Sequence, residues 1–252
     1  MSGNELILET RGLTKEFEGF VAVSGVDLRV RRGTIHALIG PNGAGKTTVF
    51  NLVTKFHTPT RGQIFFDGRD ITGAHPSDLP RRGICRSFQI SATFPHLTAL
   101  ENVRIALQRK LGTSYYFWRS ERSLDALNDR AMEFLAAVGL TEVASVAAGE
   151  LPYGRKRALE LATTLALEPE ILLLDEPTSG LGQEDIVRIT DLIRKVAQGR
   201  SVLMVEHNLS VVANLSSTIT VLQRGEILAE GPYEQLSADP RVIEAYMGTG
   251  HA

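Results

Sequence analysis

Short apolar runs alternate with segments of helical periodicity around residues 34–54 and again from about residue 155 onward. The expected strands of these regions are Thr34–Ile39, Ile171–Leu174 and Val202–Val205. The expected helices, which follow or connect them, are Lys46–Thr54, Lys156–Leu167 and Glu184–Gln198. Strands that alternate with helices form a parallel sheet covered by helices. The pattern therefore predicts an α/β fold.

The ends and the middle of the chain follow other patterns. Near the N-terminus, short β-rich runs are broken by glycines, Gly12 among them. These runs are Leu6–Leu8, Val26–Val30 and Gln63–Phe66. Between about residues 80 and 151 the periodicity becomes helical, most clearly over Leu124–Val138. The chain ends with two short strands and a helix, Ile219–Gln223, Glu226–Glu230 and Pro240–Met247.

The chain contains no internal repeat, low-complexity tract or heptad pattern, so we expect a single domain over residues 1–252. Its core is expected to take in about residues 1–80 and 155–252, including the β-rich start. A helical insertion is expected over about residues 81–154.

The segment Gly40-Pro41-Asn42-Gly43-Ala44-Gly45-Lys46-Thr47 fits the P-loop, or Walker A, pattern G-x-x-x-x-G-K-[ST]. It stands between an expected strand and an expected helix, which is the context that such a loop requires. Glycines let successive backbone N–H groups converge on phosphate oxygens, and the start of the helix adds its positive dipole. Lys46 is placed to neutralise the β- and γ-phosphates, Thr47 to bind Mg²⁺, and Thr48 to contact the α-phosphate.

A second apolar strand ends in two adjacent carboxylates, Asp175 and Glu176. Ligands of open α/β sheets collect at the carboxyl ends of the strands. Asp175 is therefore predicted to hold Mg²⁺, usually through water, and Glu176 to accept a proton from the attacking water. His207 follows the neighbouring strand, within reach of a γ-phosphate, and is predicted to act at the same site.

Composition narrows the class of partners. Acidic and basic residues are interspersed and the net charge is −2, so no electrostatic feature points to nucleic acid. One cysteine, Cys85, excludes an internal disulfide framework and suits a reducing compartment. No apolar run approaches the ~18 residues that span a bilayer, and the N-terminus does not look like a signal peptide. We expect a cytoplasmic chain.

Several motifs in one order make the chain similar to the ATPase subunits of ABC transporters. They are the phosphate loop, Gln89, Leu-Pro-Tyr-Gly-Arg at 151–155, Leu-Leu-Leu-Asp-Glu-Pro at 172–177, and His207. The resemblance implies a RecA-like core with a parallel sheet, an N-terminal antiparallel β subdomain and an inserted α-helical subdomain. It also implies ATP and Mg²⁺ as ligands.

By the same resemblance, particular residues take known roles. Phe17 would stack on adenine, and Gln89 would bind Mg²⁺, sense the γ-phosphate and link it to the helical insertion. Glu176 would be the catalytic base and His207 the switch histidine. Tyr153 and Gly154 belong to the signature segment, which would cap the γ-phosphate held by a second ATPase subunit in a head-to-tail dimer.

Within this family the chain most resembles the ATPase subunits of branched-chain amino-acid importers. The pointers are Phe88-Gln89, Phe94–Thr98, Glu101-Asn102, Tyr153-Gly154, Val205–Asn208 and the tail Val242–Gly248. The resemblance implies transmembrane permease subunits and, indirectly, a solute-binding protein as partners. The chain would then be peripheral on the inner face of the cell membrane.

The signature segment departs from the family's usual Leu-Ser-Gly-Gly-Gln, because Pro152 replaces the serine. Proline has neither a hydroxyl nor an N–H to donate, although it can start a helix well. Gly182 stands where the family often has an aspartate, and it cannot make the usual cross-dimer contact. We expect a dimer whose composite site at Pro152 is weakened, and which pairs with an identical or a different ATPase subunit.

Other functions were weighed against this interpretation. Urea and amide importers share much of the subfamily pattern. A soluble ABC ATPase acting on DNA or ribosomes is disfavoured, because neither a coiled-coil insertion nor a second cassette is present in the sequence. A P-loop kinase or GTPase would have no use for the signature segment, and a module that only binds nucleotide would have no use for Glu176.

Overall fold

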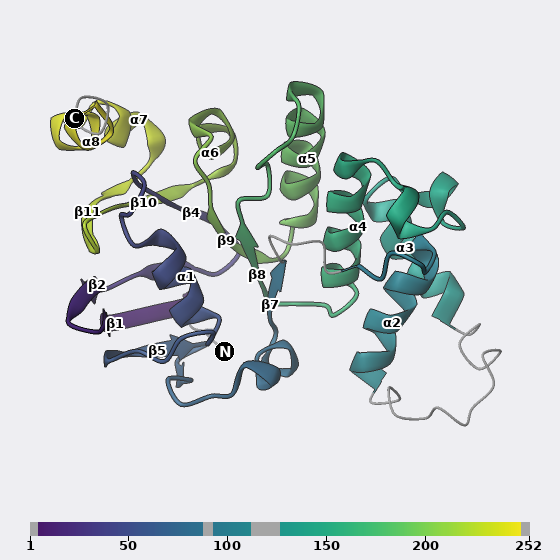
Figure 1. Ribbon diagram of the computed structural model, residues 1–252, viewed down its shortest axis with the longest axis horizontal. Helices are drawn as coiled ribbons and strands as arrows, with labels where there is room; N and C mark the ends of the chain where they lie inside the picture. The colour runs from purple at the N-terminus through teal and green to yellow at the C-terminus, as the bar shows by residue number, and fades with distance from the viewer. Residues whose placement is uncertain (1–4, 88–92, 112–126, 248–252) are drawn as a thin grey trace.

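The computed structural model describes residues 5–87, 93–111 and 127–247 and contains two sheets (Figure 1). The core sheet has the strand order β11-β10-β4-β9-β8-β7. Its strands are β4 (Ile35–Ile39), β7 (Ile84–Ser87), β8 (Ile171–Asp175), β9 (Ser201–Val205), β10 (Thr218–Gln223) and β11 (Glu226–Gly231). All neighbours pair parallel except β10 and β11, which pair antiparallel. This arrangement confirms the predicted α/β class.

The order of the core strands decides where the site forms. The register places Leu38 of β4 opposite Val205 of β9, and Val205 opposite Asp175 of β8. The carboxyl ends of these three strands therefore lie at one edge of the sheet. The phosphate loop, the acid pair and His207 all follow directly from these ends.

The second sheet is antiparallel and comes from the N-terminal part of the chain, as expected. Its strands are β1 (Leu6–Phe17), β2 (Phe20–Val26), β3 (Arg29–Arg31), β5 (Arg61–Phe66) and β6 (Arg69–Asp70). The prediction of one strand over Val26–Val30 was wrong, because β2 ends at Val26 and β3 begins at Arg29.

Gly12 does not end the first strand, contrary to expectation. It adopts φ +58°, and its N–H donates to Asp27 Oδ1 at 2.5 Å. The register of β1 against β5 shifts between Arg11 and Thr14. Only a residue that tolerates a positive φ makes such a bulge cheaply, so Gly12 lets one long strand pair first with β3 and then with β2.

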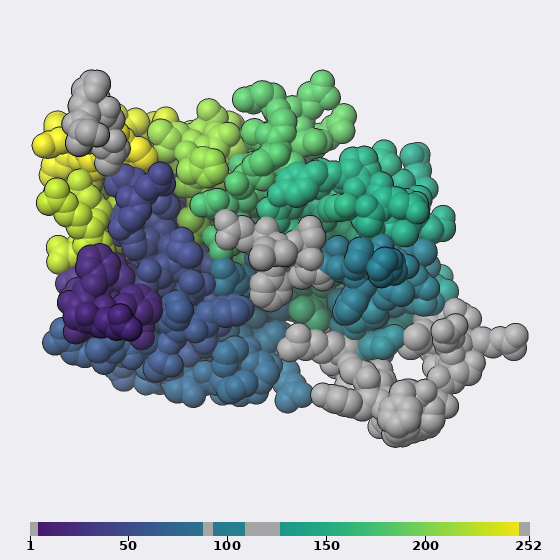
Figure 2. Space-filling view, viewed as in Figure 1, coloured from purple at the N-terminus to yellow at the C-terminus, as the bar shows by residue number. Residues whose placement is uncertain are grey.

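Helices cover the core sheet and extend the molecule to one side. Those of the core are α1 (Lys46–Val53), α5 (Gln183–Val196), α6 (Leu209–Leu215), α7 (Tyr233–Ser237) and α8 (Pro240–Met247). Those on the right of Figure 1 are α2 (Ala99–Leu111), α3 (Asn128–Ala137) and α4 (Tyr153–Leu165). Short 3₁₀ turns lie at Pro76–Asp78, Pro80–Arg82, Thr141–Val143 and Ala148–Glu150. In Figure 2, helices α7 and α8 lie beside the N-terminal part of the chain at one end of the molecule, and helices α2–α4 lie at the other end.

Most expected helices appear with small shifts. Residues Ile84–Ser87, which were expected to belong to the helical insertion, instead form the edge strand β7 of the core sheet. The first α-helix after β7 among the described residues is α2, which begins at Ala99. Residues 124–126 of the expected helix Leu124–Val138 lie outside the described residues. Among the helices described, none is both long and apolar enough to cross a membrane.

Two apolar clusters pack against the opposite faces of the core sheet. Alternate residues of β8 point to different faces, so Leu172 and Leu174 join the cluster under α4, α5 and α6, whereas Ile171 and Leu173 join the one that holds α1 and the antiparallel sheet. All four are 0% exposed. Burial on both faces is what makes β8 a continuous apolar run in sequence, and it fixes the sheet edge that carries Asp175.

Candidate nucleotide-binding site

The phosphate loop runs from the end of β4 to the start of α1 and depends on its glycines. Gly40 has φ +149°, and a Cβ on it would overlap the carbonyl oxygen of Leu222. Gly45 has φ +97° and caps α1, and a Cβ there would lie 2.8 Å from the carbonyl oxygen of Ala22. The loop is thus wedged between the β1–β2 hairpin and β10, and only glycine fits both positions.

The loop presents its polar groups at the surface. Asn42, Gly43 and Thr47 are exposed, whereas Ala44 is buried and Thr48 is half-buried. The helix α1 begins at Lys46, so its first N–H groups and the positive end of its dipole face the loop. This is the strand–loop–helix arrangement that the sequence predicts, and it can bind an anion.

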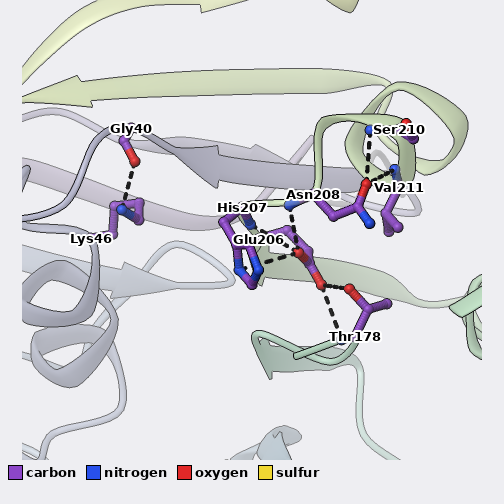
Figure 3. A network of polar contacts seen from close by, with 8 residues as sticks. All are labelled: Gly40, Lys46, Thr178, Glu206, His207, Asn208, Ser210 and Val211. Atoms are coloured by element: carbon purple, nitrogen blue, oxygen red, sulfur yellow. Dashed lines mark hydrogen bonds and ion pairs between the residues drawn. The ribbon is translucent and has the colours of Figure 1, made fainter. Parts of the chain in front are cut away.

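Lys46 folds back onto the loop that it follows. Its Nζ donates to the carbonyl oxygen of Gly40 at 2.6 Å (Figure 3) and also to that of Pro41 at 2.9 Å. Burial lowers the pKa of Lys46, and the negative charge of Glu176 opposes that shift. The strand register places the phosphate loop and the acid pair at one sheet edge, and for this reason the charge of Glu176 acts on Lys46.

The acid pair occupies two different environments. Asp175 ends β8 and is 4% exposed, and its Oδ2 accepts a hydrogen bond from Arg86 Nη2 at 2.5 Å. Glu176 is half-buried and adopts φ +47°, and its N–H donates to the carbonyl oxygen of Val205 at 2.9 Å. The positive φ ends the extended conformation of β8 at Glu176, so the two adjacent carboxylates do not continue one strand.

Glu206, between β9 and His207, is a site residue that sequence reasoning missed. It is 0% exposed, and its Oε1 accepts from the N–H of Thr178 at 3.0 Å and from the Thr178 hydroxyl. Its Oε2 accepts from the N–H groups of His207 at 2.8 Å and Asn208 at 3.0 Å (Figure 3). One buried carboxylate thereby joins the loop after Glu176 to the loop that carries His207.

This network leaves the His207 ring free to meet a ligand. Its side chain is 61% exposed, and Nδ1 lies 3.9 Å from Glu206 Oε2. Asn208 caps α6, because its Oδ1 accepts from the N–H groups of Ser210 at 3.1 Å and Val211 at 3.3 Å. The backbone on both sides of His207 is therefore fixed while its imidazole faces solvent.

Phe17 is the last residue of β1. Its side chain is 38% exposed and meets the ring of His57 edge-on at 5.3 Å, and Lys15 Nζ lies 4.9 Å from the ring centroid. An exposed aromatic face of this kind can take a base by stacking. Gln89 was predicted to act at the same site, and it lies outside the described residues.

Tyr153 and Gly154 begin α4, where Tyr153 contacts the loop after the acid pair and Gly154 packs against α5. The Tyr153 ring lies 3.7 Å from the position of a Cβ on Gly180, and its hydroxyl donates to the carbonyl oxygen of Ser179 at 3.5 Å. Tyr153 is 45% exposed. A Cβ on Gly154 would lie 2.7 Å from the carboxyl carbon of Asp185. Close packing against Asp185 alone thus requires glycine at 154.

Pro152 and Gly182 both precede helices. Pro152 is the N-cap of α4 with φ −56° and ψ 154°, and Gly182 is the N-cap of α5 with φ −72° and ψ 163°. Neither residue has a side-chain group that could make a capping hydrogen bond. The expectation that Pro152 starts its helix well is confirmed.

The C-terminal helix is a second neighbour of the phosphate loop that sequence reasoning did not find. The Gly40 N–H donates to the hydroxyl of Tyr246 in α8, and burial raises the pKa of that hydroxyl to about 12. A cavity of about 510 Å³ between loop and helix is lined by Pro41–Ala44, Arg224 and Glu244, among others. Helix α8 therefore supports the phosphate loop through the contact between Tyr246 and Gly40.

The oxygen donors at the sheet edge suit a magnesium ion. Asp175 offers a carboxylate and Thr47 a hydroxyl, and no cluster of three His, Cys, Asp or Glu side chains exists among the described residues. A site of few protein oxygens fits Mg²⁺, because Mg²⁺ keeps several waters and binds substrate phosphates. These residues could therefore hold the metal of a nucleotide complex.

Comparison with known proteins gives consistent matches. Residues 23–179 match the family model "ABC transporter", and residues 226–252 match "Branched-chain amino acid ATP-binding cassette transporter". The chain is 42% identical to the high-affinity branched-chain amino acid transport ATP-binding protein BraF of Pseudomonas aeruginosa, with 96% of this chain and 98% of that protein covered.

Solved structures agree. The ADP conformation of an ATP-binding cassette of an ABC transporter matches with a TM-score of 0.84 and 29% identity, covering 97% of this chain and 100% of that one. A dimeric post-hydrolysis cassette bound to ADP and Pi matches with a TM-score of 0.74 and 28% identity, covering 90% and 98%. The resemblance drawn from the motifs is confirmed.

Proposed function

The chain belongs to the family of ABC transporter ATP-binding proteins, and on this premise we propose that it hydrolyses Mg·ATP to drive an importer of branched-chain amino acids. The observation that carries the chemistry is the strand register that brings the phosphate loop after β4, the acid pair at the end of β8 and His207 after β9 to one sheet edge. The match of residues 226–252 and the name of the relative support branched-chain amino acids over urea or amides.

Nucleotide binding uses the backbone of the loop and the movement of the Lys46 side chain. The N–H groups of Asn42, Gly43, Ala44 and Gly45 bind the phosphates, and the Phe17 face takes the adenine. Lys46 exchanges its two carbonyl acceptors for phosphate oxygens, which compensate its charge better. Thr47, Gln89 and Asp175 would hold the Mg²⁺, which neutralises charge on the phosphates.

Hydrolysis requires a positioned water and a group that accepts its proton. Glu176 accepts the proton as the water oxygen bonds to the γ-phosphorus and the bond to the β-phosphate oxygen breaks, giving ADP and phosphate. His207 contacts the γ-phosphate from the neighbouring loop. Glu206 fixes the loops that carry both residues, so their separation is set by one buried carboxylate.

A second ATPase subunit would complete each site. The dimeric relative supports such a pair. In a head-to-tail dimer, the Tyr153–Gly154 segment of one subunit caps the γ-phosphate held by the other. Because Tyr153 contacts Ser179 and Gly180, a movement of the signature segment during closure also moves the loop after Glu176. The helices α2–α4 would pass this movement to permease subunits at the inner face of the membrane, which receive solute from a binding protein.

The test is binding and turnover by the purified chain and by the reconstituted transporter. The chain should bind a fluorescent ATP analogue with Mg²⁺, and Lys46→Ala should weaken this binding by at least about tenfold. In liposomes with its permease and solute-binding partners, leucine should stimulate hydrolysis. Glu176→Gln should keep nucleotide, form a stable dimer and lose about 10²–10⁴-fold in turnover. Hydrolysis at the wild-type rate by Glu176→Gln would remove that residue from its role.

A further inference from the structure

Arg86, near the end of β7, connects three elements of the proposed site through its guanidinium. Its Nη2 donates to Asp175 Oδ2 at 2.5 Å. Its Nη1 donates to two groups of α1 and the residue after it, Asn51 Oδ1 at 2.9 Å and Thr54 Oγ1 at 3.2 Å. One side chain of β7 is therefore bonded to the end of β8 and to α1.

These elements are the ones that deliver the proposed metal ligands. Thr47 lies in the first turn of α1, Asp175 is the last residue of β8, and Gln89 follows three positions after Arg86. Arg86 itself cannot bind a metal, since a guanidinium has donors and no acceptor. Its position at the junction of the three elements needs another explanation.

The surroundings of Arg86 hold a charge away from water. The side chain is 13% exposed, and that of Asp175 is 3% exposed. The guanidinium carbon lies 4.9 Å from the ring centroid of Phe50 and 5.0 Å from that of Phe56. A carboxylate buried this deeply is costly without a cation beside it, and the aromatic faces favour a cation here.

We propose that Arg86 is a positioning residue that stands in for magnesium beside Asp175 while the nucleotide site is empty. This inference rests on the proposed function. The guanidinium compensates the charge of Asp175, fixes its carboxylate by a hydrogen bond, and ties α1 and β8 to β7. When Mg·ATP binds, a second cation acts on the same carboxylate, so Arg86 also weakens metal binding and favours release of the metal after hydrolysis.

The charge gives opposite effects on the empty and the loaded protein. Arg86→Met keeps a flexible apolar stem between Phe50 and Phe56 and removes the cation. In EDTA, the unfolding midpoint should fall by about 5 °C or more, because Asp175 loses its counter-charge. With Mg²⁺ and a non-hydrolysable ATP analogue, the midpoint should rise by more than it does in the wild type, because the metal now supplies that charge.

Metal affinity is measured directly by the electron paramagnetic resonance signal of free Mn²⁺, titrated into the full chain saturated with the same analogue. Removing the positive charge that is hydrogen-bonded to a proposed metal ligand should tighten Mn²⁺ binding by about tenfold. Arg86→Lys keeps the charge and loses the fork, so its midpoint in EDTA should fall while its Mn²⁺ affinity stays within about twofold of wild type. Arg86→Gln is neutral and smaller, and it must show the tighter binding if Arg86→Met does not fold.

A control of the same kind is Arg130→Met in α3, which removes an arginine that is ion-paired with Glu168 at 3.0 Å and lies 4.9 Å from the ring centroid of Phe134. It should lower the midpoint without changing Mn²⁺ affinity. Unchanged or weaker Mn²⁺ binding by the neutral Arg86 variants would overturn the inference. A wild-type chain that binds neither the analogue nor Mn²⁺ would instead refute the proposed function, so the two failures are distinguishable.

Discussion

We predict that Glu206→Gln destabilises the chain and slows hydrolysis, although Glu206 is not expected to touch the nucleotide. The wild-type carboxylate accepts four hydrogen bonds, two from Thr178 and one each from the N–H groups of His207 and Asn208. A glutamine of the same shape has one oxygen and one NH₂ group. The NH₂ must face either the Thr178 side or the His207 side of this buried site.

The magnitude follows from the better of these two orientations. If the NH₂ faces Thr178, the hydroxyl can turn and accept, but the Thr178 N–H is left buried without an acceptor, which costs about 1–3 kcal/mol. The two remaining bonds change from charge-assisted to neutral, at about 1 kcal/mol each. A neutral amide is easier to bury than a carboxylate and offsets part of this. The net loss is about 2–3 kcal/mol, or about 4–12 °C in the unfolding midpoint of a chain this long.

The assay pairs stability with turnover. Calorimetry and urea unfolding measure the loss of free energy, and steady-state hydrolysis in the reconstituted transporter measures the displacement of Glu176 and His207, for which we expect about a 10²-fold fall in kcat. The control is Glu234→Gln, because Glu234 is exposed on α7. A Glu206→Gln protein with the wild-type midpoint and wild-type kcat would refute the argument that this carboxylate holds the two loops.

Three further predictions test other parts of the structure. Gly40→Ala should weaken nucleotide binding by at least about tenfold in a titration, because its Cβ would overlap the carbonyl of Leu222, whereas Gly73→Ala, with open space around it, should bind like the wild type. Burial lowers the pKa of His36 to about 4 from 6.5, so the unfolded chain binds more protons between these values and stability should fall by about 2 kcal/mol from pH 7 to pH 5 in urea unfolding. His36→Gln should lose that part of the pH dependence, and an unchanged slope would contradict the assignment. Pro152→Ser, which restores a hydroxyl at the N-cap of α4, should raise turnover or dimer affinity in the reconstituted complex, and equal values for the two proteins would count against a weakened composite site.

Local sequence was sufficient for the elements whose residues are both apolar and continuous. The strand ending at Asp175 and the helix after Gly45 appear within one residue of their predicted ends. Burial on both faces gives β8 a continuous apolar run, and the glycine directly before α1 marks where that helix begins. Lys46, Asp175, Glu176 and His207 could likewise be singled out from short runs of neighbouring residues. Each ends a core strand, or lies in the loop or at the helix start that follows one, so the parallel sheet brings them to one edge once the strand order is known.

The sequence by itself determined the phosphate loop, the acid pair and the α/β class, since each is a short pattern whose chemistry is complete in neighbouring residues. Only the tertiary structure decided which distant groups support them. Glu206 joins two loops 28 residues apart, Arg86 reaches Asp175 across 89 positions, and Tyr246 meets Gly40 from the far end of the chain. The partner of a buried charge is chosen by strand order and register, and no local pattern of residues encodes that choice.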